Sequence, residues 1–128
     1  MSQIERRNHR SASTSRALVY QLRASMHKAN LSGFVLADED GLCLASAGDD
    51  DACDEVAAHL PIFGQKVPTF EGVLYGASVQ WDIQMERLQI GDIRLYLCAI
   101  GASDARNDQM QRSMAGVTRI LDPMLATA

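Results

Sequence analysis

The sequence lacks the features that mark secreted, disulfide-stabilised or membrane-spanning proteins. It has only three cysteines, Cys43, Cys53 and Cys98, and no CxxC pair. An odd number without paired spacing is typical of reduced thiols in a cytoplasm. No apolar run approaches the ~18 residues that a membrane span needs, and the basic start has no apolar stretch behind it, as a secretory signal would. We therefore expect a cytoplasmic protein without a transmembrane segment.

Motifs for catalysis and for binding nucleotides or metals are also lacking. There is no Walker loop, no Rossmann glycine pattern and no G-x-S-x-G elbow. The carboxylates do not follow EF-hand spacing. Cys53 and His59 are six residues apart, too far round the predicted helix to lie on one face, and Cys43 comes from a strand, so we expect no zinc site. The sequence thus predicts a non-catalytic protein with no cofactor.

Charge is distributed unevenly along the chain, whose formal net charge is −4. Residues 1–16 hold four arginines and one glutamate, whereas from Ala29 to Gln65 there are eight carboxylates and no Lys or Arg. An acidic body argues against nucleic acid as the main partner. Residues 1–13 are polar and aperiodic, which predicts a disordered basic tail. Such a tail could touch a membrane or a nucleic acid, although a solvated arm is commoner.

Residues 14–128 have the size of a single domain. Its first helix is predicted to start at Thr14 or Ser15, either of which can cap it. The helix carries one apolar stripe: Leu18, Leu22, Met26 and Ala29. Residues 30–33 end it. Two short apolar runs, residues 34–37 and 42–45, then flank the turn Asp-Glu-Asp-Gly, a pattern that predicts a β-hairpin.

A second helix is predicted to begin at three consecutive aspartates, residues 49–51, because carboxylates cap a helix start and complement its dipole. Its predicted buried stripe comprises Cys53, Val56, Ala57 and Leu60. Pro61 lacks a backbone donor and disfavours helical geometry in the residue before it. We therefore expect this helix to kink or stop near Leu60, and residues 61–68 to form a loose connection.

Three more strands and a helix complete the predicted domain. Alternating apolar residues mark the first of these strands: Val79, Trp81, Ile83 and Met85. The apolar positions then become even-numbered, at Leu88 and Ile90, which predicts a bulge or turn near Glu86. Gly91 and Asp92 predict a tight hairpin. Residues 93–100 are apolar on both faces and predict a central strand.

The last helix follows residues 101–104. Its predicted stripe comprises Met110, Met114, Val117 and Leu121, with Pro123 as its stop. The whole order is helix, two strands, helix, three strands, helix. Such a count fits an α/β (α+β) domain in which helices pack on one antiparallel sheet.

This order, with its motifs in place, resembles the roadblock/dynein light-chain family. The likeness is carried by the hairpin of residues 33–46 with its Asp-x-x-Gly turn, the small residues 56–58 and the strand of residues 93–101. It extends from about Arg16 to Leu121. The resemblance implies the roadblock-like order αββαβββα, with one antiparallel five-stranded sheet and helices packed on both faces.

The resemblance also implies a homodimer, or a heterodimer with a paralogue, in which third strands join and second helices lie side by side. It implies a scaffold or co-regulator of a Ras-like small GTPase, as in bacterial polarity and gliding systems. The candidate dimer-interface residues are Val79, Trp81, Ile83, Ala57 and Leu60. The candidate partner-binding residues are Asp50, Asp51, Asp54, Glu55, Ala58 and His59, whose carboxylates would form an acidic patch.

A small-ligand sensor of the profilin- or PAS-like α/β type is the alternative. A sensor needs polar side chains on inward strand positions to fix its ligand. The predicted inward positions are uniformly apolar: Val79, Trp81 and Ile83 in one strand, and Ile93, Leu95 and Leu97 in another. This pattern favours the docking module. A purely structural dimer inside a larger complex has the same sequence features.

Overall fold

The computed structural model describes residues 2–76 and 79–126, and the side chains of residues 12–76 and 79–122. Its elements, in chain order, are α1 (Ser2–Lys28), β1 (Gly33–Ala37), β2 (Cys43–Gly48), α2 (Asp50–Gly64), β3 (Thr69–Tyr75), β4 (Gln80–Ile90), β5 (Ile93–Ile100) and α3 (Arg106–Ala126). The predicted order αββαβββα is confirmed.

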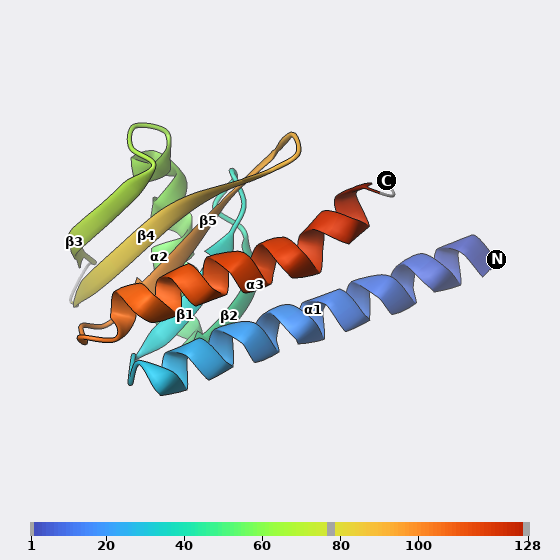
Figure 1. The fold of residues 1–128 in the computed structure, drawn as a ribbon. Coiled ribbons are helices and arrows are strands. Elements are labelled where there is room, and N and C mark those ends of the chain that lie inside the picture. Colours follow the sequence, from blue (N-terminus) through green and yellow to red (C-terminus); the bar gives the residue numbers. More distant parts are fainter. Residues whose placement is uncertain (1, 77–78, 127–128) are drawn as a thin grey trace.

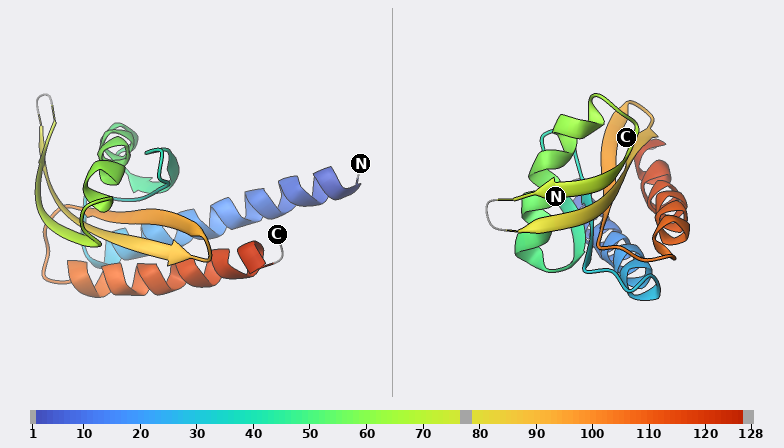
Figure 2. Two further views of the ribbon diagram at one scale, coloured as in Figure 1. Left: turned by 90° about the horizontal axis from the view of Figure 1, so that it is seen from above. Right: turned by 90° about the vertical axis from the view of Figure 1, so that its left-hand side faces the viewer.

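The strands form one antiparallel sheet in the order β2-β1-β5-β4-β3. Helices α1 and α3 lie side by side on one face, and α2 covers the other (Figures 1 and 2). Strand β5 is central and its residues 95–100 are buried on both faces, as predicted. The five-stranded sheet with helices on both faces is therefore confirmed.

Apolar side chains on the two faces of the sheet form two separate cores. One lies beneath α1 and α3 and is built mainly from Leu18, Leu22, Phe34, Leu36, Leu97, Met110 and Val117. The other lies beneath α2 and includes Val35, Cys53, Val56, Leu60, Ile83, Met85, Tyr96 and Cys98. Successive residues of a strand point to opposite faces, so a single buried strand contributes to both cores.

Helix α1 begins at Ser2, so the predicted helix start at Thr14 or Ser15 is wrong. The backbone of residues 2–13 belongs to this helix. This segment contains no Gly or Pro, and it extends a helix already nucleated by packing of its second half. The end is as predicted. Asn30 takes a positive φ of 53°, and the amide of Leu31 donates to Met26 O at 2.9 Å in a Schellman cap.

The predicted hairpin and the cap of the second helix are both confirmed. Asp38 Oδ1 accepts from the amides of Asp40 at 2.9 Å and Leu42 at 3.0 Å, and Gly41 takes a φ of 81° that suits glycine. Asp49 is the N-cap of α2, where its Oδ1 accepts from the amide of Ala52 at 3.0 Å. Short-range polar chemistry therefore fixes both boundaries.

Both helix-ending predictions made from proline are wrong. Helix α2 continues through the buried Pro61 to Gly64, and α3 runs past Pro123 to Ala126. In α2, packing continues beyond the proline, because Phe63 stacks on Phe70 of β3 with ring centroids 5.1 Å apart. A proline inside a helix costs about 3 kcal/mol, which burial of Leu60, Pro61 and Gly64 offsets in α2.

Strand β4 is continuous, so the predicted bulge near Glu86 is wrong. Its pairing with β5 runs without a register shift from Ile83 opposite Ile100 to Ile90 opposite Ile93. The apolar positions change parity because different helices cover the two halves of the strand. Ile83 and Met85 belong to the core beneath α2, whereas Leu88 and Ile90 belong to the core beneath α1 and α3.

The third strand lies elsewhere than the sequence suggested. Strand β3 comprises residues 69–75, for which the sequence pattern predicts no strand, and it forms one edge of the sheet. The strand that carries Trp81 and Ile83 is internal, since β4 pairs with β3 on one side and β5 on the other. Phe70 and Leu74 face α2 and alternate with the exposed Glu71 and Val73.

Candidate partner-binding surface

Helix α2 presents an acidic outer face to solvent. Its apolar stripe packs on the sheet, so the opposite side of the helix stays accessible. All six predicted partner-binding residues lie on that side: Asp50, Asp51, Asp54, Glu55 and Ala58 are exposed, and His59 is half-buried. Ile62, 59% exposed, extends the face with an apolar side chain that the sequence analysis did not single out.

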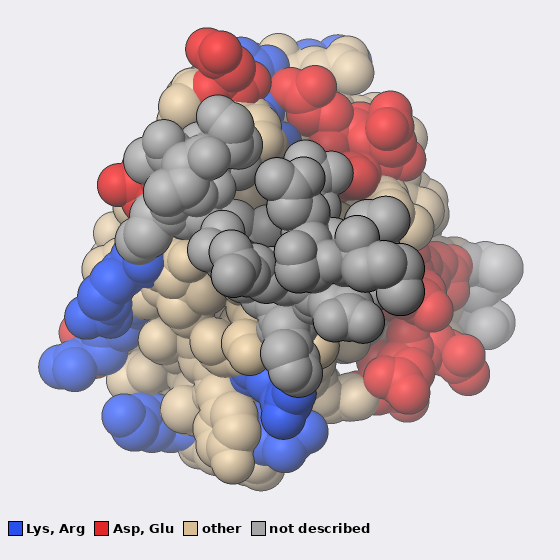
Figure 3. Space-filling model, turned by 90° about the vertical axis from the view of Figure 1, so that its right-hand side faces the viewer, with Lys and Arg blue, Asp and Glu red and all other residues tan. Residues whose placement is uncertain are grey.

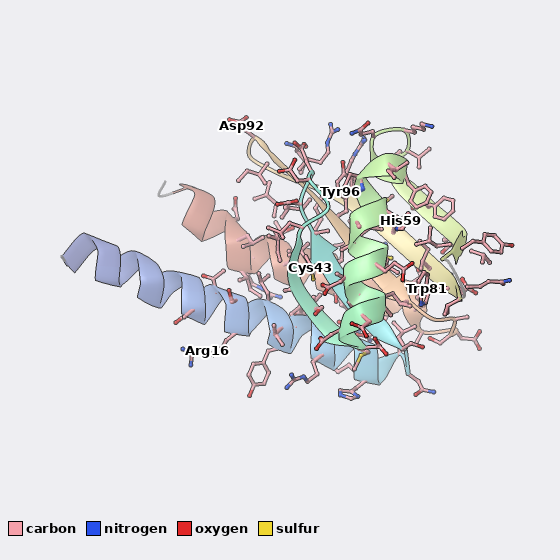
Figure 4. The ribbon with its side chains drawn as sticks, turned by 180° about the vertical axis from the view of Figure 1, so that it is seen from behind. Arg16, Cys43, His59, Trp81, Asp92 and Tyr96 are labelled. Carbon is pink, nitrogen blue, oxygen red and sulfur yellow. The ribbon has the colours of Figure 1, made fainter. Side chains whose placement is uncertain are left out.

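The two sides of α2 face different parts of the fold. Gly41 in the β1–β2 turn packs against Ala58, because a Cβ added to Gly41 would lie 3.1 Å from Ala58 Cα. A Cβ added to Gly76, just after β3, would lie 2.9 Å from Glu55 Oε1. Figure 4 shows the same division, with Cys43 on one side of α2 and Trp81 on the other. Ala58 therefore borders the β1–β2 hairpin, and Glu55 borders the β3 edge.

His59 is held along the helix rather than projecting from it. Its Nδ1 lies 2.8 Å from the carbonyl oxygen of Glu55, one turn earlier, and shares a hydrogen bond with it. A hydrogen bond to a carbonyl needs a proton on Nδ1, which leaves Nε2 as the atom free to meet a partner. His59 is thus a positioned polar group on the side of α2 that carries Glu55.

The outer edge of β3 is the second candidate surface. In the described part of the sheet β3 pairs with β4 alone, so its other edge carries unpaired backbone groups. Val73 is 44% exposed and Tyr75 is 67% exposed, and Val79, just before β4, is 50% exposed. An exposed strand edge that carries apolar side chains favours pairing with another chain.

The structure corrects most of the predicted dimer interface. Ala57, Leu60 and Ile83 are fully buried inside the chain, so they have no surface to offer a partner. A charged residue at position 83 would test folding rather than assembly. Trp81 is half-buried and packs against the core beneath α2, whereas Val79, which the pattern predicted to point inward, is exposed. The apolar pattern that pointed to these residues shows that their side chains are buried. It does not show whether a helix of the same chain or a partner chain covers them.

Arg106 joins the start of α3 to the strands near the β3 edge. Its Nη1 donates to Asp82 Oδ1 at 2.9 Å and to Gly101 O at 2.8 Å, and its Nη2 lies 3.9 Å from Glu71 Oε1. The Arg106 side chain is only 14% exposed, whereas its partners Glu71 and Asp82 are 60% and 47% exposed, so these contacts are screened by solvent. The network fixes β3 and β4 against α3, and its partners lie too far along the chain for the sequence to reveal it.

The cysteines and the described cavity suggest no chemistry. Cys53 and Cys98 are buried free thiols and Cys43 is half-buried; burial raises the pKa of Cys53 to about 11 and also raises the pKa of Cys98. In the described residues no three His, Cys, Asp or Glu side chains are grouped to hold a metal.

An open groove of about 670 Å³ lies between α3 and the end of β4, lined by Leu88, Gln111, Met114, Ala115, Thr118, Arg119 and Asp122. The apolar clusters fill the space between sheet and helices where a sensor would hold its ligand.

No helix in the part of the chain that the structure describes is long and apolar enough to cross a bilayer.

The sequence matches no family model and no curated protein. Several solved structures match the fold. MglB of Myxococcus xanthus aligns over 84% of this chain and 90% of its own, with 14% identity and a TM-score of 0.59. The gliding protein MglB of Thermus thermophilus aligns over 86% and 92%, with 15% identity and a TM-score of 0.60.

The chain has a roadblock-like fold. A third structure, titled MglB with tetrameric arrangement, aligns over 86% of this chain and 91% of its own, with 15% identity and a TM-score of 0.60. These matches span nearly the whole of both chains, so the roadblock-like core is the bulk of the molecule. At such low identity the likeness concerns the backbone, and the surface residues need their own argument.

Proposed function

We propose that this chain is a non-catalytic homodimeric scaffold or regulator that binds a Ras-like small GTPase or a related polarity partner. The observation that carries the proposal is the open β3 edge beside the exposed face of α2, in a chain with the fold of MglB. This edge offers a site for self-association, and α2 offers a docking surface next to it.

The dimer forms when β3 strands from two copies pair across a two-fold axis. Such an axis requires antiparallel pairing, because each residue meets its counterpart in reverse order. The exposed Val73 and Tyr75 of both copies would come together along the seam. The opposite edge strand, β2, is less available, since α1 packs against it within the chain. Pairing through β3 therefore removes the more exposed edge.

The same axis would set the two α2 helices side by side and antiparallel. Glu55 and His59 lie on the side of α2 toward β3, so they would face the partner's helix. The acidic start of one α2 would lie beside the Lys66 end of the other, an arrangement that favours pairing. The two acidic clusters would then form two separate patches, with Asp50 and Asp54 still facing solvent.

The small GTPase is proposed from the roadblock resemblance and the shared fold together. A flat platform of two helices with acidic ends suits a partner with a basic surface, and such charges raise the encounter rate. The chain itself would contribute no reacting group, since it has no nucleotide-binding loop and no nucleophile motif. Any effect on nucleotide hydrolysis would act by positioning residues of the GTPase.

Affinity capture with the immobilised chain tests this function. Extracts of the native cell are loaded with GDP or with a non-hydrolysable GTP analogue, and each captured GTPase is purified for direct titration. We expect one small GTPase to bind, with different affinities in the two nucleotide states, and no GTP hydrolysis by the chain alone. Binding of no GTPase in either state, or hydrolysis by the chain alone, would refute the proposal.

A further inference from the structure

Charges of opposite sign lie on opposite faces of the sheet. Between Glu5 and Asp38 the chain has no carboxylate but six basic residues, all in α1: Arg6, Arg7, Arg10, Arg16, Arg23 and Lys28. The next eight charged residues are all acidic and lie on α2, at its cap or in the β1–β2 turn that packs against α2. Figure 3 shows Lys and Arg mostly on the side of α1 and α3, and Asp and Glu mostly on the side of α2.

One stripe of α1 presents this basic charge to solvent. Arg16, Tyr20, Arg23 and His27 are spaced by three and four residues, so they share one side of the helix. All four are exposed, and Tyr20 is 74% exposed. Figure 4 shows Arg16 pointing away from the body of the molecule. The buried side of α1, which includes Leu18 and Leu22, faces the sheet and α3.

Neighbouring groups do not neutralise the stripe. Arg16, Arg23 and Lys28 form no ion pair with any residue whose side chain the structure describes. On α3, the adjacent helix, Arg112 is paired with Asp108 at 3.1 Å, and the exposed Arg119 and Asp122 balance each other. The exposed side of α1 therefore keeps its net positive charge.

We propose that the α1 face docks on the surface of an anionic lipid bilayer. A helix of 27 residues is about 40 Å long, and basic residues along it are attracted to anionic headgroups. Tyr20, in the middle of the stripe, is an aromatic side chain of the kind that settles at the headgroup level. The acidic α2 packs on the other face of the sheet, and its start comes near the end of α1, where a Cβ added to Gly48 would lie 3.1 Å from Met26 Sδ. At distances beyond a Debye length of about 8–10 Å from that point, repulsion by its carboxylates is screened.

The shape of this face favours a bilayer over a nucleic acid. Helices α1 and α3 pack side by side, and two helices in contact are about 20 Å across. The major groove of DNA is about 12 Å wide and admits one helix. Because α3 lies along the buried side of α1, the pair is too wide to enter the groove, whereas the exposed stripe of α1 can lie along a plane. Docking by α1 would leave α2 directed away from the bilayer and available to a protein partner.

Flotation with lipid vesicles tests the docking. The full chain is mixed with vesicles of phosphatidylcholine alone or of phosphatidylcholine and phosphatidylglycerol in equal amounts, at low and high salt. We expect binding only to the anionic vesicles, and loss of binding at high salt. Each basic residue near an anionic surface contributes about fivefold to partitioning, so Arg23→Gln should weaken binding about fivefold and Arg16→Gln with Arg23→Gln about 25-fold.

Lys66→Gln is the matched control, because Lys66 is an exposed cation on the α2 side of the sheet. It should leave vesicle binding unchanged, while Tyr20→Ser should weaken binding at unchanged charge. Far-ultraviolet circular dichroism verifies the fold of each variant.

Equal binding to neutral vesicles, equal effects of Lys66→Gln and Arg23→Gln, or no binding at low salt would overturn the proposal. So would binding to a DNA duplex without vesicle binding, or sedimentation of the chain by itself. Loss of dimerisation alone would leave the anionic selectivity intact, which separates this test from that of the proposed function.

Discussion

Gly64, the last residue of α2, lies directly against the ring of Tyr96 in the central strand β5. Tyr96 is only 1% exposed, and its ring occupies the space that a side chain at position 64 would need. The contact brings the end of α2 close to the sheet, just after Pro61. Arg87 closes the same end by donating to Gly64 O at 2.8 Å. The end of α2 is therefore fixed by tertiary contacts rather than by its own sequence.

Replacing Gly64 should destabilise the protein by overpacking. Gly64→Ala places a methyl group against a ring that cannot move, at a cost of about 1–3 kcal/mol in urea unfolding, more than the helix propensity that alanine gains. In a Tyr96→Leu background the ring is absent, so the same substitution should cost far less. Equal costs in the two backgrounds, measured as a double-mutant cycle, would mean that the contact does not limit packing.

Stability should fall at alkaline pH because of Cys53. Burial raises the pKa of this thiol from 9.0 to about 11, so between these values the unfolded chain releases a proton that the folded chain keeps. The thiol's contribution is complete below pH 9 and decreases as pH rises toward 11, by up to about 1.4 kcal/mol per pH unit. Subtracting the profile of Cys53→Ala removes the titration of Tyr and Lys. A flat difference between the two profiles would contradict the shift.

The start of α1 should be dispensable for folding. Leu18 is the first α1 residue of the core among the described side chains, and the helix projects beyond the sheet before it (Figure 1). Deleting residues 1–11 should move the thermal midpoint by less than about 3 °C, whereas a loss of 1 kcal/mol would move it about 4 °C or more. A larger drop in calorimetry would show that this segment packs on the domain.

The sequence predicts a feature of this fold when neighbouring residues cause that feature, and fails when packing between distant elements causes it. Asp38, Gly41 and Asp49 act through their own neighbours, so their turn and cap were predictable from residue type. The continuity of β4 was not predictable, because the change of buried face near Arg87 reflects where α2 ends and α3 lies. For the same reason, alternation identified Ile83 as buried but could not tell a core from an interface.

The edge position of β3 was also hidden from the sequence. Its short pattern, with Phe70 and Leu74 inward, follows a proline and contains Gly72, so it resembles a loop more than a strand. The acidic face of α2 was predicted correctly, because exposed charges follow the helical period. Ile62 was missed because it follows Pro61, where the helix was expected to end.

Reversing charge on α2 should slow partner binding. Asp50→Lys with Asp54→Lys changes two exposed carboxylates that stay solvent-facing in the proposed dimer, and loss of steering should lower the association rate about tenfold at low salt. Asp92→Lys with Asp104→Lys makes the same change in net charge in loops away from α2 and should have less effect. Stopped-flow rates at low and high salt measure both. Equal rates for the two variants would move the docking face away from α2.

Dimerisation through the β3 edge is the central claim, and light scattering coupled to gel filtration measures it directly. The parent chain should elute with twice its mass of 14.0 kDa. Val73→Lys puts a charge on the β3 seam and should give monomers, while Leu44→Lys, on the opposite edge strand and similarly exposed at 39% against 44%, should remain dimeric. A parent chain that is monomeric at every concentration, or one that only Leu44→Lys dissociates, would contradict the account.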